Sequence, residues 1–243
     1  MAETTLLDAR GIVKRFGALT VLNGVDFTVR AGEAVGIVGP NGAGKTTLLA
    51  ALSGSFGISA GTIQLRGEDI TGVDAAERCR MGIARSHQVP RPFSGMTVFE
   101  NVLTAAMQGG GFRRQEAYDR SLDALEVCGM MHVANRRAEA LGLLDRKRLE
   151  LTRALATNPQ ILLLDEIGGG LTDGEAIELV ETIRTLRKRD ITLVWIEHIV
   201  HVLVQVVERL VCMDAGKIIA DGHPQTVLSD ATVVSAYLGG HTA

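Results

Sequence analysis

Gly39-Pro-Asn-Gly-Ala-Gly-Lys-Thr-Thr47 is the stretch of this 243-residue chain that decides the fold. It follows an apolar run at residues 34–38 and precedes another at residues 48–52, as expected for a buried strand, a tight turn and a helix. The turn fits the phosphate-loop pattern G-x-x-x-x-G-K-[ST]. Glycines let the backbone N–H groups of such a turn surround phosphate oxygens, and the following helix points its positive end at the same anion. We therefore predict a nucleotide-binding loop rather than a glycine-rich turn without a ligand.

Two side chains of this loop carry specific chemistry. Lys45 would add a full positive charge near the terminal phosphates, and the Thr46 hydroxyl would coordinate magnesium. A nucleotide and Mg²⁺ are therefore the expected cofactors. The predicted nucleotide-binding residues of the loop are Gly39, Pro40, Asn41, Gly42, Ala43, Gly44, Lys45, Thr46 and Thr47.

Composition excludes several other classes of protein. The net charge is −3 and the basic residues are scattered, which disfavours a nucleic-acid-binding surface. Cys79, Cys128 and Cys212 are far apart in the sequence, so we expect reduced thiols rather than a disulfide framework or a metal site. The chain lacks a signal-peptide pattern and an apolar run long enough to cross a bilayer. We expect any role at a membrane to depend on a partner.

The N-terminal part predicts short strands joined by turns. Residues 6–13 and 25–29 alternate as strands do, and the expected turn positions are Gly17, Asn23-Gly24 and Gly32. Residues 61–66 form a further expected strand. Phe16 has two interpretations: it packs in the core, which is the commoner role of an aromatic residue, or it stacks on a nucleotide base.

The middle of the chain is mainly helical. A short helix is expected at residues 74–81. The stretch 82–89 is expected to form a strand whose last residue is Gln88, because Pro90 and Pro92 follow. Three further helices are predicted at residues 97–107, 115–127 and 145–156. Because they separate two strands that belong to one sheet, we interpret this part as a helical insertion.

Two carboxylates follow the continuously apolar residues 161–164. Such a strand is typical of a parallel sheet covered on both faces, and ligands of these sheets bind beyond the carboxyl ends of the strands. Asp165 suits a magnesium ligand and Glu166 suits a residue that polarises water. The alternative is a solvated strand end without a ligand.

The rest of the chain continues the alternation of helix and strand. His198 follows another buried strand and is expected at the same edge as Lys45 and Asp165, although an isolated histidine is more often structural. The expected elements are a helix at residues 175–188, a strand at 191–196, a helix at 199–208, a hairpin of strands at 210–213 and 217–220, and a helix that ends at Leu238.

In this order the motifs resemble those of the ATP-binding subunit of an ABC transporter, across essentially the whole chain. Residues 155–166, Ile196-Glu-His198 and Ala236-Tyr-Leu-Gly-Gly240 are most similar to the branched-chain amino acid uptake class. The resemblance implies a role for each remaining site residue. Phe16 would stack on the base, Gln88 would join magnesium and the attacking water to the transport partner, Glu166 would be the general base, and His198 would contact the γ-phosphate.

Two departures from the family pattern concern the nucleotide held by a second subunit. The family's LSGGQ signature, which closes over that nucleotide, is replaced by Leu141-Gly-Leu-Leu-Asp145. The expected contacts across the dimer are therefore Gly142, Leu143, Leu144 and Asp145. Compared with the family signature, this stretch lacks the serine hydroxyl and carries a bulkier side chain in place of a glycine. Residues 167–172 replace a proline-containing run, and Thr172 stands where the family has Asp or Asn.

The predicted fold class is α/β, a P-loop NTPase with a RecA-like core. We predict a single ABC nucleotide-binding domain over residues 1–243. Its antiparallel β portion would comprise residues 1–36 and 59–72, its helical insertion residues 90–155, and its parallel-sheet core the remainder.

The predicted function is ATP hydrolysis at a head-to-tail dimer that powers an importer for branched-chain or related amino acids. The expected partners are transmembrane subunits, which would be contacted through Gln88 and residues 89–101. A second ATP-binding subunit, either identical or related, is also expected, and a solute-binding protein would take part indirectly. The expected location is the cytoplasmic face of the membrane. One alternative is a nucleotide-gated subunit with negligible hydrolysis beside an active companion. Another, a soluble ABC-type ATPase of repair or translation, is disfavoured because those proteins usually carry paired cassettes or long insertions.

Overall fold

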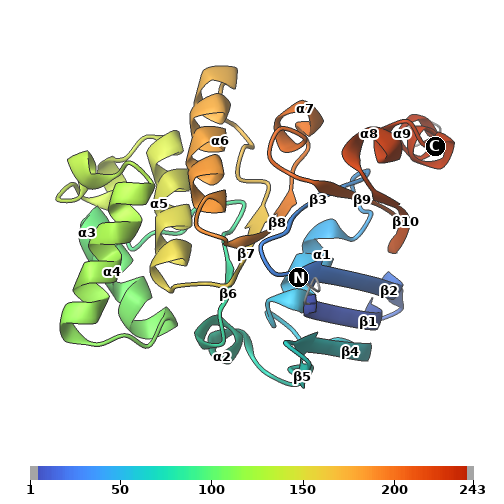
Figure 1. The fold of residues 1–243 in the computed structure, drawn as a ribbon, viewed down its shortest axis with the longest axis horizontal. Helices are drawn as coiled ribbons and strands as arrows, with labels where there is room; N and C mark the ends of the chain where they lie inside the picture. The colour runs from blue at the N-terminus through green and yellow to red at the C-terminus, as the bar shows by residue number, and fades with distance from the viewer. Residues whose placement is uncertain (1–4, 240–243) are drawn as a thin grey trace. The chain divides into compact units, whose positions relative to one another are not determined.

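The computed structural model describes residues 5–239, and the chain divides into two compact units (Figure 1). The first unit, here called the loop unit, comprises Met1–Ala75 and Thr192–Ala243. The second, here called the helical unit, comprises Ala76–Ile191. Within residues 5–239, no helix is long and apolar enough to cross a membrane.

The loop unit contains a four-stranded antiparallel sheet. Its strands lie in the order β2 (Leu19–Arg30), β1 (Thr5–Phe16), β4 (Ala60–Leu65) and β5 (Glu68–Asp69). Both β1 and β2 are longer than the sequence predicts, because their antiparallel pairing continues up to Phe16 and Leu19.

The predicted turn at Asn23-Gly24 is wrong. Val13 pairs with Asn23 and Ile12 pairs with Val25, so Gly24 is the extra residue of a β-bulge inside β2. Its φ of 71° is a conformation that favours glycine. The chain reverses at residues 17–18 instead.

The second sheet of the loop unit carries the phosphate loop. Its strands lie in the order β10 (Lys217–Gly222), β9 (Arg209–Asp214), β3 (Ala34–Val38) and β8 (Thr192–Ile196). β3 runs parallel to both β8 and β9. All residues of β3 and β8 are buried, as their continuous apolar sequence predicts.

Among residues 5–239, the helices of the loop unit are α1 (Lys45–Leu52), α7 (Val200–Leu203), α8 (Pro224–Leu228) and α9 (Ala231–Gly239). Figure 1 shows α1 between β3 and the antiparallel sheet, and its residues from Leu48 to Leu52 are buried. The helix predicted at residues 199–208 is much shorter. The N–H of Glu208 already bonds to the carbonyl of Ala34, because the chain is extended beside β3 by that point.

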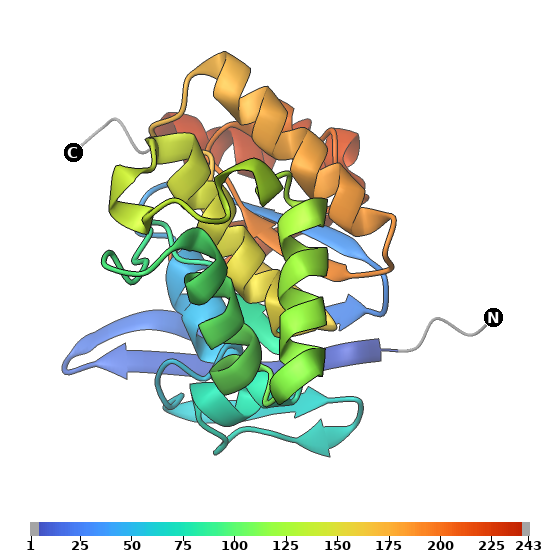
Figure 2. The ribbon, with the colours of Figure 1, turned by 90° about the vertical axis from the view of Figure 1, so that its left-hand side faces the viewer.

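The helical unit contains a two-stranded parallel pair and most of the helices (Figure 2). Its strands are β6 (Ile83–Arg85) and β7 (Ile161–Asp165), paired from Ile83 with Ile161. Its helices are α2 (Ala75–Arg80), α3 (Val98–Thr104), which continues as a π-helical turn over Ala105–Gly109, α4 (Arg114–Val127), α5 (Leu143–Ala156) and α6 (Asp173–Arg187), with short 3₁₀ turns at Met131–Val133 and Ala138–Ala140.

The strand predicted to end at Gln88 is shorter, since β6 ends at Arg85. The N–H of Ser86 still bonds to the carbonyl of Leu163. Beyond it the chain leaves the strand pair for α5, where the N–H of Arg91 bonds to Glu150. The three predicted helices between β6 and β7 are confirmed as α3, α4 and α5, and the predicted combination of parallel strands, antiparallel β portion and helices is confirmed as well.

The cysteine prediction also agrees with the structure. All three cysteines are free thiols, with Cys128 and Cys212 buried and Cys79 half-buried. Burial raises the pKa of Cys128 and of Cys212 to about 11, which keeps both thiols protonated at neutral pH.

Candidate nucleotide-binding site

The phosphate loop occupies the turn between β3 and α1. Gly39, Gly42 and Gly44 adopt φ values of 144°, 81° and 99°, which lie in the region that favours glycine. Gly44 precedes α1 and offers no capping side chain, and the first turn of α1 carries no acidic residue. The positive end of this helix therefore suits an anion.

Gly39 has a second requirement, which is space. A Cβ at this position would lie 2.0 Å from the backbone carbonyl oxygen of Met213 on β9. Since that oxygen belongs to the backbone of a buried strand, it cannot move aside easily.

Gly39→Ala is therefore expected to destabilise the loop unit. Strain and overlap together cost about 2 kcal/mol, which lowers the melting temperature by about 4 °C or more. Thermal unfolding checks this, with Gly72→Ala as the matched control, because a Cβ at Gly72 meets no atom within 4 Å. Equal melting temperatures for the two variants would contradict the close packing at Gly39.

The Lys45 side chain is bound to the loop itself. It is buried, and its Nζ donates to the carbonyl of Gly39 at 2.7 Å and to that of Pro40 at 3.0 Å. Its ammonium group is thus held inside the curve of the loop. A phosphate oxygen is a stronger acceptor than these neutral carbonyls, because it carries a negative charge.

The hairpin of β9 and β10 is hydrogen-bonded to the phosphate loop. The N–H of Gly216 donates to the carbonyl of Ala43 at 3.1 Å, and the N–H of Asn23 donates to the carbonyl of Gly216 at 2.9 Å. A Cβ at Gly216 would lie 2.4 Å from the carbonyl oxygen of Val21. The sequence marks residues 214–216 only as a turn, so this supporting role was missed.

Phe16, at the end of β1, is 50% exposed, so the expectation that it packs in the core is wrong. Its ring meets that of Phe56 edge-on, with the centroids 5.6 Å apart. The Nζ of Lys14 lies within 4.8 Å of both ring centroids. An exposed aromatic pair beside a cation is a surface on which a base can stack, and sequence reasoning missed Phe56 and Lys14.

His198 is exposed at the carboxyl end of β8. Because β8 and β3 are parallel neighbours, with Ile196 opposite Ile37, His198 and the phosphate loop follow adjacent strands at the same edge of the sheet. The neighbouring Glu197 is buried, and its carboxylate accepts a bond of 3.2 Å from the N–H of His198. Within the loop unit, the predicted association of His198 with the loop is thus supported by strand order.

The predicted carboxylates lie in the helical unit, at the end of β7. Asp165 is buried and its Oδ2 accepts a bond of 2.6 Å from the guanidinium of Arg85. Arg85 ends the adjacent parallel strand β6, and the sequence did not identify it. The ion pair with Arg85 fixes the orientation of the Asp165 carboxylate at the end of β7.

Glu166 and Gln88 are joined directly. The side-chain Nε2 of Gln88 donates to Oε2 of Glu166 at 2.5 Å. Glu166 has a φ of 49°, an uncommon conformation for a residue with a side chain. Strained backbone of this kind is often found at functional sites, and the structure brings together two of the predicted site residues.

The altered signature begins α5. Gly142 is the N-cap residue and Leu143, Leu144 and Asp145 form the first turn, so the helix starts two residues before its predicted start at Asp145. A Cβ at Gly142 would meet no atom within 4 Å. Leu143 is 43% exposed, so its bulk lies on the surface.

Arg146 fixes the approach to this helix. Its guanidinium donates to the carbonyl of Leu141 and to that of Glu139, both at 2.9 Å. These bonds satisfy carbonyl groups of the loop before α5. The sequence analysis did not identify this contact.

Thr172 has a structural role in place of the expected carboxylate. It caps α6 in a reciprocal capping box with Glu175. The two hydrogen bonds from Thr172 lower the pKa of the Glu175 carboxyl. The hydroxyl of Thr172 is therefore already engaged within its own subunit.

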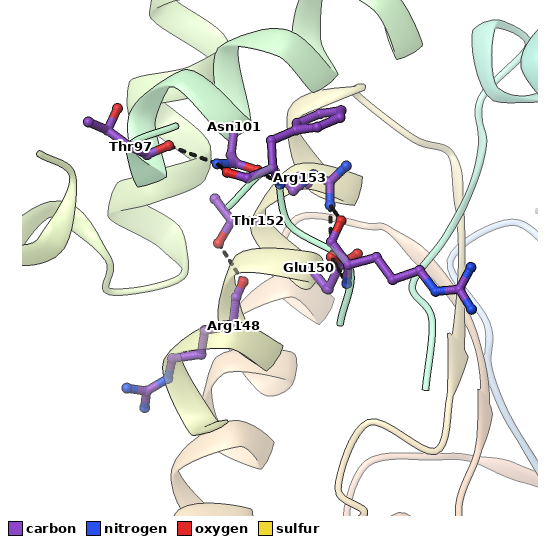
Figure 3. Close-up of polar contacts among 8 residues, drawn as sticks. Thr97, Asn101, Arg148, Glu150, Thr152 and Arg153 are labelled. Atoms are coloured by element: carbon purple, nitrogen blue, oxygen red, sulfur yellow. Dashed lines mark hydrogen bonds and ion pairs between the residues drawn. The ribbon is translucent and has the colours of Figure 1, made fainter. Parts of the chain in front are cut away.

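The chain after Gln88 is tied to α5 by a buried carboxylate (Figure 3). Glu150, which is 6% exposed, accepts bonds from the N–H of Arg91 at 2.9 Å and from Nη1 of Arg153 at 2.7 Å. Arg153 also donates to the carbonyl of Arg91 at 3.0 Å, and its guanidinium lies 5.2 Å from the ring centroid of Phe93.

Asn101 on α3 holds the same segment from the other side. Its side chain accepts a bond from the N–H of Phe93 and donates to the carbonyls of Phe93 and Thr97, at 2.8 Å, 3.1 Å and 2.9 Å respectively. Residues 91–97 are thus fixed between α3 and α5. Within this segment and just before it, Val89, Phe93 and Met96 keep their apolar side chains exposed.

Glu150→Gln is expected to loosen this segment. A charge-assisted bond to the N–H of Arg91 becomes a neutral one, so hydrogen exchange of that amide should quicken about tenfold. Glu178→Gln is the matched control, because it weakens the exposed pair of Glu178 with Arg148, another residue of α5. Equal exchange at Arg91 in both variants would show that Glu150 does not hold the segment.

Comparisons with known proteins agree with these features. A family model described as ABC transporter matches residues 22–168, which include the phosphate loop, the signature and the two carboxylates. The chain belongs to the ABC transporter family. A second model, described as branched-chain amino acid ATP-binding cassette transporter, matches residues 217–243.

Relatives within the ABC transporter family match over nearly their whole length. The chain is 38% identical to the high-affinity branched-chain amino acid transport ATP-binding protein LivG of Salmonella typhimurium, over 96% of this chain and 98% of that protein. It is 34% identical to the corresponding protein BraF of Pseudomonas aeruginosa, over 96% and 98%. A crystal structure of an ABC transporter's ATP-binding cassette in its ADP conformation superposes with a TM-score of 0.88, at 32% identity and with coverage of 97% and 99%.

These findings confirm the predicted fold class and the predicted family. The chain has the fold of ABC-transporter ATP-binding subunits, with its P-loop, parallel strands, antiparallel β portion and helices, and it is similar in sequence to the LivG and BraF class.

Proposed function

We propose that this chain is the ATP-hydrolysing subunit of an ABC importer for branched-chain or related amino acids. The observation that carries the proposal is the phosphate loop with the Lys45 ammonium held inside it. The solute class comes from the relatives, which are named as branched-chain amino acid transport proteins. Phosphate release from ATP by the purified chain tests the catalytic part.

The nucleotide would be bound mainly by the loop unit. The adenine base would stack on the exposed ring of Phe16. Loop amides, the helix start at Thr46 and Thr47 and the Lys45 ammonium would offset the charge of the phosphates. His198, which follows the strand next to the loop, would contact the γ-phosphate.

The oxygen donors present suit magnesium. Magnesium is a hard cation that takes hydroxyl, carboxylate and amide oxygens together with phosphates. It would be held by the Thr46 hydroxyl, the Asp165 carboxylate and the amide oxygen of Gln88. When bound, it would neutralise charge on the β- and γ-phosphates.

Glu166 would act as the general base on the attacking water. Its bond with Gln88 positions the carboxylate before substrate arrives, and preorganisation of this kind lowers the cost of reaching the reactive geometry. For hydrolysis, the residues of the loop unit and those of the helical unit must act on the same nucleotide. That requirement is part of the proposal.

ATP would also join two subunits head to tail. The helix start at Gly142 to Asp145 of one subunit would cover the γ-phosphate bound by the other, through backbone N–H groups rather than a serine hydroxyl. ATP would favour the closed dimer and hydrolysis would release it, which is a ligand-driven shift of populations.

The exposed side chains of Val89, Phe93 and Met96 would contact transmembrane subunits at the cytoplasmic face of the membrane. Because this segment is bonded to α5 through Glu150, movement at the membrane would be passed to the helix that starts at the signature. A solute-binding protein would take part indirectly, and nucleic acid is not an expected partner. Co-purification with the membrane subunits tests this assignment, and normal transport after Phe93→Ala would count against it.

One observation favours a second candidate function, a nucleotide-gated subunit with negligible hydrolysis. Gly142 lacks a hydroxyl, and the hydroxyl of Thr172 is engaged in its capping box, so two polar contacts across the dimer are absent. Losing one such donor typically lowers rates about 100-fold or more. A companion subunit would then supply the active site.

A further inference from the structure

Tyr237 on α9 contacts the first residue of the phosphate loop. Its hydroxyl oxygen accepts a bond of 2.8 Å from the N–H of Gly39. Although the two residues are 198 positions apart in the sequence, both belong to the loop unit. The motif reading used residues 236–240 only as a family resemblance and gave Tyr237 no role.

Three contacts fix the backbone of Gly39. Its N–H bonds to Tyr237, its carbonyl accepts from Lys45, and its Cα lies so close to β9 that a Cβ would overlap the carbonyl of Met213. The bond from the Gly39 N–H to the Tyr237 hydroxyl does not involve Lys45, so it can fix how the chain enters the loop whatever other acceptor the ammonium contacts.

The contact is a specific one rather than general packing. A pocket open to solvent, lined by Pro40, Asn41, Asp214 and Ser235 among others, lies between the loop and α9. The helix itself is placed by Val233, which is buried, and by Asp230, whose carboxylate accepts from the N–H of Thr232 at 2.7 Å. Burial raises the pKa of Tyr237, so the hydroxyl stays protonated and neutral at physiological pH.

We propose that Tyr237 is a positioning residue of the nucleotide site, through which docking of the C-terminal helix α9 sets the shape of the phosphate loop and hence the affinity for ATP. Coupling of this kind is reciprocal: if docked α9 favours ATP, bound ATP favours docked α9 by the same factor. The inference rests on the proposed function, because it assumes that the loop binds ATP.

Tyr237→Phe removes the hydroxyl and keeps the ring. The dissociation constant for ATP is expected to rise about threefold to tenfold, since the buried N–H of Gly39 loses its acceptor. Tyr118→Phe is the matched control, because Tyr118 lies on α4 in the helical unit and is 45% exposed. The melting temperature of both variants should stay within a few degrees of the wild type.

Hydrogen exchange of α9 in the wild-type chain gives a second measurement that needs no variant. Saturating ATP should slow exchange of the α9 amides, and this slowing should be smaller in Tyr237→Phe. If the wild-type chain binds ATP, then equal affinity in Tyr237→Phe, or α9 exchange that ATP leaves unchanged, overturns the inference. If the wild-type chain itself fails to bind ATP, the proposed function fails, and this proposal with it.

Discussion

Replacing Lys45 with alanine is expected to weaken ATP binding about 100-fold and to abolish phosphate release. The buried ammonium is the one full positive charge that the loop sequence itself supplies. Its charge-assisted bonds to phosphate oxygens contribute about 2 to 3 kcal/mol, and each 1.4 kcal/mol corresponds to about tenfold in affinity. Isothermal titration with ATP in the presence of magnesium measures the change.

A control must separate lost binding from lost folding. In the free protein Lys45 bonds to the carbonyls of Gly39 and Pro40, so its removal also changes the empty loop. Lys217→Ala removes an exposed lysine at the start of β10 in the same unit, and both variants should be compared by thermal unfolding. A folded Lys45→Ala variant that binds ATP as the wild type does would contradict the account.

Glu166→Gln is expected to lower steady-state phosphate release at least 100-fold while ATP affinity changes little. A positioned general base contributes about 10² to 10⁴ in rate, and the amide that replaces it is nearly isosteric but not basic. The side chain is only partly buried, so the substitution should cost little stability. Binding and turnover should therefore separate in this variant.

The same experiment distinguishes the two candidate functions. Suppose that the wild type releases phosphate at a measurable rate. If Glu166→Gln releases it much more slowly while Glu178→Gln on α6 does not, the function as a hydrolysing subunit is supported. If the wild type and Glu166→Gln release phosphate at equal, near-zero rates, the nucleotide-gated subunit is favoured instead. In that case the missing donors at Gly142 and Thr172 provide the physical explanation.

The parts of the site that the sequence predicted are those made by contiguous residues. The phosphate loop needs a strand, a glycine turn and a helix in direct succession, so its chemistry can be recognised locally. The buried strand before Asp165 is similar, because continuous apolar sequence identifies a covered strand and its end. The positions of α3, α4 and α5 followed from helical periodicity for the same reason.

The contacts that sequence reasoning missed join distant parts of the chain. Arg85 reaches Asp165, Gly216 supports Ala43, and Tyr237 reaches Gly39. None of these pairs shares a local pattern, since each depends on the register of strands or the docking of a helix. The error at Gly24 has a related cause, because a glycine in a bulge and a glycine in a turn need the same backbone freedom.

Exposure was also difficult to predict. An aromatic residue such as Phe16 is usually buried, but here it is the last residue of β1, next to the chain reversal, and its ring is half in solvent. The short α7 shows a different case: apolar Val206 and Val207 are buried in and just after a turn that follows the helix, rather than in the helix itself. Composition alone does not distinguish these situations.

The most direct test of the central claim is a crystal structure of Glu166→Gln with ATP and magnesium. The Lys45 ammonium is expected to donate to phosphate oxygens, and Asp165 and Thr46 are expected to share the magnesium ion. Residues 142–145 of a second copy are also expected to cover the same γ-phosphate. A structure in which ATP binds elsewhere, with Lys45 in contact with no phosphate oxygen, would contradict the account.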